Sequence, residues 1–158
     1  MSDSHEQFMR RAIELAQRGV DTNAGGPFGC VVVKDGRIIG EGCNEVTSSN
    51  DPTAHAEVVA IRNACAAIGS FQLEGCHIYT SCEPCPMCLG AIYWARPARI
   101  FYAGTREDAA NAGFDDQFIY EEMEKQLEDR TMKLENLSRE EAQKVFQNWA
   151  DKPDKIEY

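Results

Sequence analysis

The chain lacks the features of membrane-spanning and exported proteins. It contains no run of about eighteen apolar residues, so we expect no transmembrane helix and no membrane partner. The first six residues, Met1 to Glu6, are polar and hold no apolar stretch of a signal peptide, which predicts a cytoplasmic protein. Linkers, repeats and low-complexity segments are also missing, and 158 residues suffice for one core, so a single domain over residues 1–158 is expected.

Positive charge is scarce in this sequence. Sixteen Lys and Arg oppose 26 Asp and Glu, and the formal net charge is −10. Much of this balance serves solubility, but contacts with phosphates require Lys and Arg, so we expect no nucleic-acid partner. Acidic residues also crowd the C-terminal part, at Glu121, Glu122, Glu124, Glu128, Asp129, Glu140 and Glu141.

Cysteine is the residue type that the chain has in excess. The count of seven is odd, and a cytosolic chain with clustered cysteines more often binds metal than forms disulfides. Three of them, Cys82, Cys85 and Cys88, lie three residues apart. The other four are expected to be small buried hydrophobic side chains: Cys30, Cys43, Cys65 and Cys76.

The hydrophobic pattern predicts an α/β domain with a mixed, mostly parallel sheet. Asp35-Gly36 is a strong hairpin signal between two apolar runs. Further along, a strand, a helix and a strand follow one another at the spacing of a parallel βαβ unit. We expect strands at 28–34, 37–40, 76–80 and 99–103, and a short one near 132–134.

Capping residues place the expected helices. Ser4, with Gln7 three residues on, is typical of a capping box, and Asp51-Pro52 of an N-cap followed by proline at the first helical position. We expect helices from about 4 to 19, 52 to 68, 84 to 96, 116 to 126 and 138 to 149.

Cys85 and Cys88 have the spacing of metal ligands. Residues three apart on a helix share a face, so both sulfurs could reach one ion. A position in the first turn also favours thiolates, the form that binds metal, because the helix N-terminus carries partial positive charge.

His55 and Glu57 form the second half of the pattern. Two residues apart within a helix would put them on different faces, but at a helix start both side chains can reach a point beyond the end. His55, Cys85 and Cys88 would supply three zinc ligands and leave a fourth position for water, as in catalytic sites. Glu57, which is not a ligand, would then transfer the proton.

Two alternative interpretations of the cysteines stay open. Cys82 could join His55, Cys85 and Cys88 in a closed structural zinc site, which would make the protein a non-enzymatic interaction module. A redox C-x-x-C centre is the other alternative. Both halves of H-x-E and P-C-x-x-C at helix starts favour the catalytic zinc site, because together they form the nucleobase deaminase signature.

These segments resemble the cytidine and deoxycytidylate deaminase superfamily, and within it the small zinc-dependent guanine deaminases of bacteria. The resemblance covers roughly residues 8 to 158. It is densest at Gly25 to Gly29, Asn50 to Glu57 and Ser81 to Pro97, with Ala112 to Asp116 as the more subfamily-specific stretch. It implies a three-layer α/β/α fold with a five-stranded mixed sheet between helices.

The resemblance also implies roles for single residues. It assigns one Zn²⁺ per subunit to His55, Cys85 and Cys88, proton transfer to Glu57, and a hydrogen bond with the base edge to Asn44. Turn chemistry for Asn44, core packing for Phe28 and Trp94, and a frayed terminus for Tyr158 are the alternatives. The implied substrate-binding set is Asn44, Phe28, Ala56, Trp94, Asp116 and Tyr158.

The function expected from this resemblance is hydrolysis of guanine to xanthine and ammonia, on a small-molecule purine base. Guanosine, cytosine or an ammeline-like triazine are alternative substrates, and deamination of adenosine in transfer RNA is a further one. In this subfamily the C-terminal segment can cross to the partner subunit, which implies a homodimer.

Overall fold

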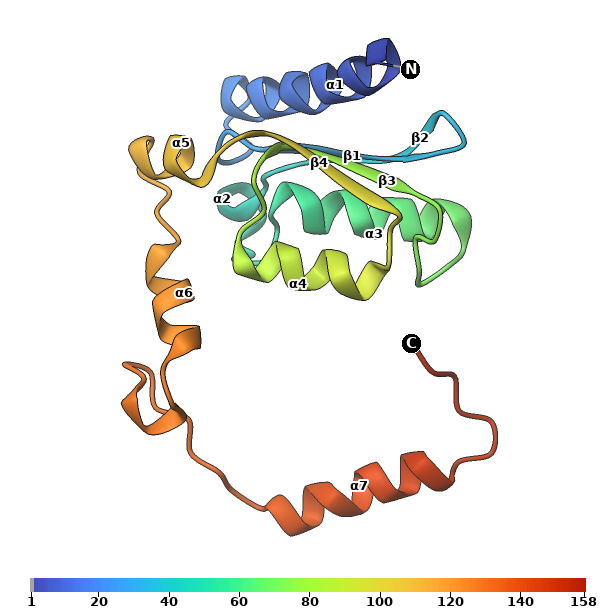
Figure 1. The fold of residues 1–158 in the computed structure, drawn as a ribbon, viewed down its shortest axis with the longest axis vertical. Helices are drawn as coiled ribbons and strands as arrows, with labels where there is room; N and C mark the ends of the chain where they lie inside the picture. The colour runs from blue at the N-terminus through green and yellow to red at the C-terminus, as the bar shows by residue number, and fades with distance from the viewer. Residues whose placement is uncertain (1) are drawn as a thin grey trace. The chain divides into compact units, whose positions relative to one another are not determined.

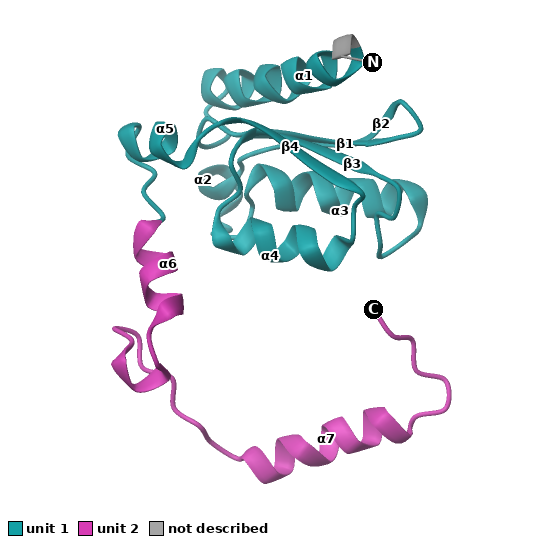
Figure 2. Ribbon diagram, in the orientation of Figure 1, with its two compact units in different colours: residues 1–116 teal, residues 117–158 magenta. Residues whose placement is uncertain are grey.

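A computed structural model describes residues 2–158 of the chain. The chain divides into two compact units, one ending at Asp116 and one running from Gln117 to Tyr158 (Figure 2). A single folding domain over residues 1–158 stays a prediction. None of the helices in the described residues combines the length and the hydropathy that crossing a bilayer requires.

The first unit is built on a four-stranded sheet in the order β2-β1-β3-β4. Only β3 and β4 pair in parallel, whereas β1 is antiparallel to both β2 and β3. The mixed sheet is confirmed, but the expectations of a mostly parallel sheet and of five strands were wrong. The strands are β1 (Gly29–Lys34), β2 (Arg37–Cys43), β3 (His77–Cys82) and β4 (Arg99–Gly104).

The Asp35-Gly36 hairpin decides where the strands point. Both turn residues have positive φ, 49° and 74°, as a tight two-residue hairpin turn requires. The turn makes β2 antiparallel to β1. Because β1 is also antiparallel to β3, and β3 is parallel to β4, the strands β2, β3 and β4 run in one direction. The carboxyl ends of these three strands and the beginning of β1 therefore lie at the same edge of the sheet.

Helices cover both faces of this sheet (Figure 1). Helix α1 (Ser2–Asp21) packs on one face, and α3 (Ala56–Ile68) and α4 (Pro86–Ala95) pack on the other. Alternate strand residues supply the two cores: Val31 and Tyr79 face α1, whereas Val32 and Ile78 face α3 and α4. The three-layer α/β/α architecture is thus confirmed.

Small side chains bring α3 very close to β2. A Cβ atom on Gly40 would lie 2.7 Å from the Ala60 carbonyl oxygen, and one on Gly42 would lie 2.5 Å from that of Ala56. Ala56, Ala60 and Ala64 recur every four residues and are fully buried on this face. Glycine facing alanine therefore fixes the position of α3, including its first residue.

Two helices begin later than the sequence predicted. Asp51 does not cap α3, because its Oδ1 accepts hydrogen bonds from the Thr53 N–H and hydroxyl at 2.8 and 2.7 Å and forms a separate turn. Helix α3 begins at Ala56 and α4 at Pro86, with His55 and Cys85 as the N-cap residues. Ser4 lies inside α1, which begins at Ser2.

The remaining elements are short or belong to the second unit. Helix α2 (Val46–Ser49) follows β2, and α5 (Arg106–Asn111) follows β4 with a capping box between Thr105 and Asp108. The second unit holds α6 (Gln117–Glu124), a 3₁₀ turn (Leu127–Asp129) and α7 (Arg139–Asp151). Residues 132–134 form no strand in the described chain, and the side chain of Met132 is 79% exposed.

Gly29 provides a test of the packing of α1 against β1. A Cβ atom at this position would lie 2.1 Å from the Ala12 carbonyl oxygen, so we expect Gly29→Ala to destabilise the protein by at least about 2 kcal/mol in urea unfolding. Gly90→Ala is the matched control: no atom lies within 4 Å of its added Cβ, and alanine suits a helix interior, so stability should rise by about 0.5–1 kcal/mol. A Gly29→Ala variant as stable as the parent would contradict this packing.

Candidate metal centre

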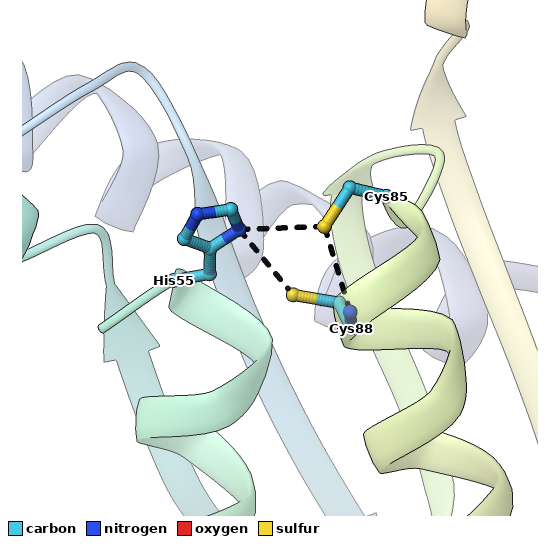
Figure 3. A group of neighbouring side chains, drawn as sticks. All are labelled: His55, Cys85 and Cys88. Atoms are coloured by element: carbon cyan, nitrogen blue, oxygen red, sulfur yellow. Dashed lines mark hydrogen bonds between the residues drawn. The ribbon is translucent and has the colours of Figure 1, made fainter. Parts of the chain in front are cut away.

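Three side chains from the starts of α3 and α4 converge on one point (Figure 3). The Nδ1 atom of His55 lies 3.5 Å from the Sγ atom of Cys85 and 3.5 Å from that of Cys88. All three ligand atoms lie within 4.8 Å of one another, and they form the only such group of three among the described residues. The structure therefore brings together the three residues that the sequence predicted as metal ligands.

The spacing of these atoms fits a zinc ion. Zinc bonds of about 2.3 Å to sulfur and 2.0–2.1 Å to nitrogen give a tetrahedron whose sulfur–nitrogen edge is about 3.6 Å. The two observed edges of 3.5 Å match this value. One imidazole and two thiols are also a donor set that zinc prefers. His55, Cys85 and Cys88 are therefore positioned to bind one Zn²⁺, and a fourth ligand such as water would complete its coordination.

The start of helix α4 fixes the positions of the two sulfurs. Cys85 is the N-cap of α4, Pro86 is its first residue, and the Cys88 N–H donates to the Cys85 Sγ atom at 3.5 Å. Hydrogen bonds from the Cys88 thiol and from His55 lower the pKa of Cys85 to about 4. The same contact with Cys85, together with burial and the nearby Glu57, raises the pKa of Cys88. Metal binding therefore displaces a proton from Cys88.

Cys82 does not belong to this group. Its Sγ atom donates to the Thr105 carbonyl oxygen at 3.6 Å, and burial raises its pKa to about 11. Cys82 is therefore a neutral thiol whose sulfur faces Thr105 and not the other two cysteines. This geometry contradicts a closed Cys₃His site that includes Cys82.

Glu57 lies in the first turn of α3, beside the ligands. Its side chain is only 5% exposed, and its Oε1 accepts a hydrogen bond of 2.9 Å from the Thr80 hydroxyl. The pKa of Cys88 is raised first by its contact with Cys85 and by burial, and then by the charge of Glu57 and a hydrogen bond between the thiol and this carboxylate. Sequence reasoning missed Thr80, because a threonine inside an apolar strand gives no signal of its partner.

Asn44 directly follows β2, at the end of the sheet where the carboxyl ends of β2, β3 and β4 lie, and it is 6% exposed. Its Oδ1 accepts hydrogen bonds from the backbone N–H groups of Gly26 and Val46, at 3.2 and 3.1 Å. Gly25 must be glycine, because a Cβ would lie 2.3 Å from both Asn44 oxygens. The turn chemistry expected as an alternative for Asn44 is thus present, and it leaves the amide N–H groups of Asn44 as the donors of this side chain.

Phe28 and Ala56 lie at the same edge of the sheet. The Phe28 ring is partly buried against the core and meets Phe114 edge to face, with ring centroids 5.0 Å apart. Ala56 is fully buried as the first residue of α3, so only its main chain could contact a ligand.

Asp116 and Glu83, which lies in the loop before Cys85, both form ion pairs with Arg106. Arg106, at the start of α5, has its Nε atom 3.8 Å from an Asp116 carboxylate oxygen and 3.7 Å from one of Glu83. Glu83 stands two residues before the ligand Cys85. The ion pairs therefore hold Asp116 on the side of the sheet where the ligands lie.

Trp94 lies at the end of α4 that is remote from the ligands. Trp94 is 62% exposed near the end of α4, six residues and about 9 Å of helix rise beyond Cys88. This exposure also contradicts the alternative that Trp94 packs in the core. Tyr158 is 70% exposed in the second unit.

The family model of the cytidine and deoxycytidylate deaminase zinc-binding region matches residues 2–104, which include all three zinc ligands and Glu57. The chain belongs to this family of zinc-dependent deaminases.

Within the family, the chain is similar to a guanine deaminase along nearly its whole length. It is 58% identical to the guanine deaminase of Bacillus subtilis over 155 residues, which cover 98% of this chain and 99% of the relative. The crystal structure of the Bacillus enzyme superimposes with a TM-score of 0.95, over 98% of each chain. A tRNA-specific adenosine deaminase of Aquifex aeolicus is 38% identical over 98 residues, 62% of this chain and 64% of the relative.

Removing one ligand tests the metal centre. We expect Cys88→Ala to lose bound zinc after dialysis, because two remaining ligands hold the ion far more weakly. Cys82→Ala is the matched control and should keep about one zinc per chain, since its sulfur faces Thr105. Elemental analysis of the two purified variants gives the zinc content. Zinc loss in Cys82→Ala with retention in Cys88→Ala would refute the assignment.

Proposed function

We propose that the protein hydrolyses guanine to xanthine and ammonia. The observation that carries the substrate is the 58% identity to a guanine deaminase along 98% of this chain. That similarity continues beyond residue 104, where the family model stops, and beyond the segment shared with the Aquifex tRNA deaminase. The C-terminal part of the chain is therefore the part that supports guanine over adenosine in RNA.

Glu57 carries the proton in this proposal. Bound zinc supplies Lewis acidity and lowers the pKa of its water toward about 7. Glu57 lies beside ligand Cys88 and is nearly buried, so its carboxylate can accept the proton of the attacking water and deliver it to the ring nitrogen next to C2. The water oxygen bonds to C2 as a hydroxyl, and Glu57 passes the proton of this hydroxyl to the amino group. The C2–amino bond then breaks, ammonia leaves, and C2 keeps a carbonyl oxygen.

Residues at the carboxyl edge of the sheet would bind the base. The Asn44 amide N–H groups suit an acceptor on the purine, since its Oδ1 is held by two backbone N–H groups. Asp116, fixed by Arg106, suits the N1–H and amino donors of guanine. Phe28, paired with Phe114, would cover a face of the ring, and the Ala56 N–H at the start of α3 is a further donor. Roles for Trp94 and Tyr158 stay predictions.

The substrate prediction is tested by ammonia release from a panel of bases and nucleosides. We expect guanine to react with a kcat/KM at least about 100-fold above those of guanosine, cytosine, cytidine, adenine and ammeline, because a missing hydrogen-bond partner leaves buried polar groups unpaired. A transfer RNA carrying a target adenosine serves as the control for RNA editing. Preference for any other member of the panel would refute the guanine assignment.

Replacing the proton carrier tests the mechanism. Glu57→Gln keeps the shape of the side chain and leaves the three zinc ligands in place, so we expect full zinc content. Without the carboxylate, kcat should fall by at least about 10³-fold. Turnover by the zinc-loaded variant at the rate of the parent protein would exclude Glu57 as the proton carrier.

The second unit supports a homodimer. On α7, Val145, Phe146 and Trp149 form an apolar stripe at helical spacing, and their side chains are 67%, 74% and 43% exposed. Stripes of this kind are normally covered, and we propose that a second copy of the chain covers this one.

Cytoplasmic location also stays a prediction.

Light scattering on a sizing column tests the dimer. The parent protein should elute with twice the mass of one chain, and Phe146→Glu should shift it toward the monomer, because a charge buried in an apolar interface is costly. Gln147→Glu adds the same charge to α7 at a position that faces away from the stripe and should leave the mass unchanged. A monomeric parent protein would refute the proposal.

A further inference from the structure

A buried hydroxyl lies directly under the Glu57 carboxylate. Thr80, on the central strand β3, is 1% exposed, and its Oγ1 donates to the Glu57 Oε1 at 2.9 Å. Hydrogen bonds to an ionised carboxylate are about twice as strong as those between neutral groups. Both partners are almost completely removed from water, so this contact is weakly screened.

The surroundings of Thr80 are otherwise apolar. On β3, Thr80 lies on the same face as Ile78, toward α3 and α4, and its partner across the antiparallel pair is Cys30. Cys30 is fully buried, and its thiol donates to the Val31 carbonyl oxygen at 4.0 Å. A valine would have the same shape and pack equally well at position 80. The hydroxyl is therefore explained by its bond to Glu57 and by no packing requirement.

We infer that Thr80 is a positioning residue for proton transfer, which rests on the proposed function of Glu57. The β-branched side chain of threonine has few χ1 rotamers, so its hydroxyl is fixed by the strand. This hydroxyl holds Oε1 of Glu57 and leaves Oε2 as the oxygen that meets the reacting water. The strand thus sets the direction of a carboxylate that belongs to a helix.

Kinetics of three variants test the inference. Thr80→Val removes the hydroxyl and keeps the shape, and partners that orient reacting groups typically change activity by about 10–100-fold. We expect kcat to fall within this range with KM nearly unchanged, while zinc content stays at one per chain. Thr80→Ser should restore most of kcat. Ile78→Val, a core change on the same face of β3, controls for destabilisation and should leave kcat unchanged.

A double-mutant cycle in urea adds a readout that needs no activity. Thr80→Val should lower the unfolding midpoint of the parent protein but have a much smaller effect in a Glu57→Ala background, because coupled residues are not additive. Equal effects in both backgrounds, or a Thr80→Val enzyme with parental kcat, would overturn the role of Thr80. A parent protein inactive on guanine would overturn the proposed substrate alone, since the cycle is read from folding.

Discussion

The structure depends on the meeting of two helix N-termini at one point. His55 and Cys85 are the N-cap residues of α3 and α4, and Glu57 and Cys88 lie in the first turns that follow. The partial positive charge of both helix starts gives this point a positive potential, which favours thiolates and a carboxylate there. A shift of either helix by a fraction of its pitch would break the two 3.5 Å contacts between the His55 Nδ1 atom and the cysteine sulfurs.

The small residues of β2 and α3 maintain this arrangement. Gly40 and Gly42 let the backbone of α3 lie against the strand, so no long side chain can reorient between them. From the other direction, Thr80 of β3 holds the carboxylate that α3 carries. Helix position and side-chain direction are therefore both set by the sheet, and sites supported by strands and helices are held more precisely than sites on loops.

Sequence reasoning found the metal centre but not all of its setting. His55, Cys85 and Cys88 were predictable because ligand spacing is local, and Glu57 because it stands two residues from a ligand. The starts of α3 and α4 were misplaced because Asp51 and Pro84 are good capping residues that serve turns and loops here. Strand direction was missed because the pairing of β1 with β3 joins segments more than forty residues apart. Thr80 was missed because its partner, Glu57, lies on another element, and the sequence around Thr80 does not indicate that contact.

The two ends of the sheet differ: one end holds the metal ligands, and the other holds the turn between β1 and β2. The Asp35-Gly36 turn closes the hairpin at the end of the sheet opposite the metal ligands. The seven residues of β2 separate the two ends by about 20 Å. Both turn residues are exposed, and Asp35 already carries a side chain at this tip. This tip is therefore the natural attachment point for a fluorescent reporter or a surface tether, which would leave the path of a diffusing base to the reacting groups unobstructed.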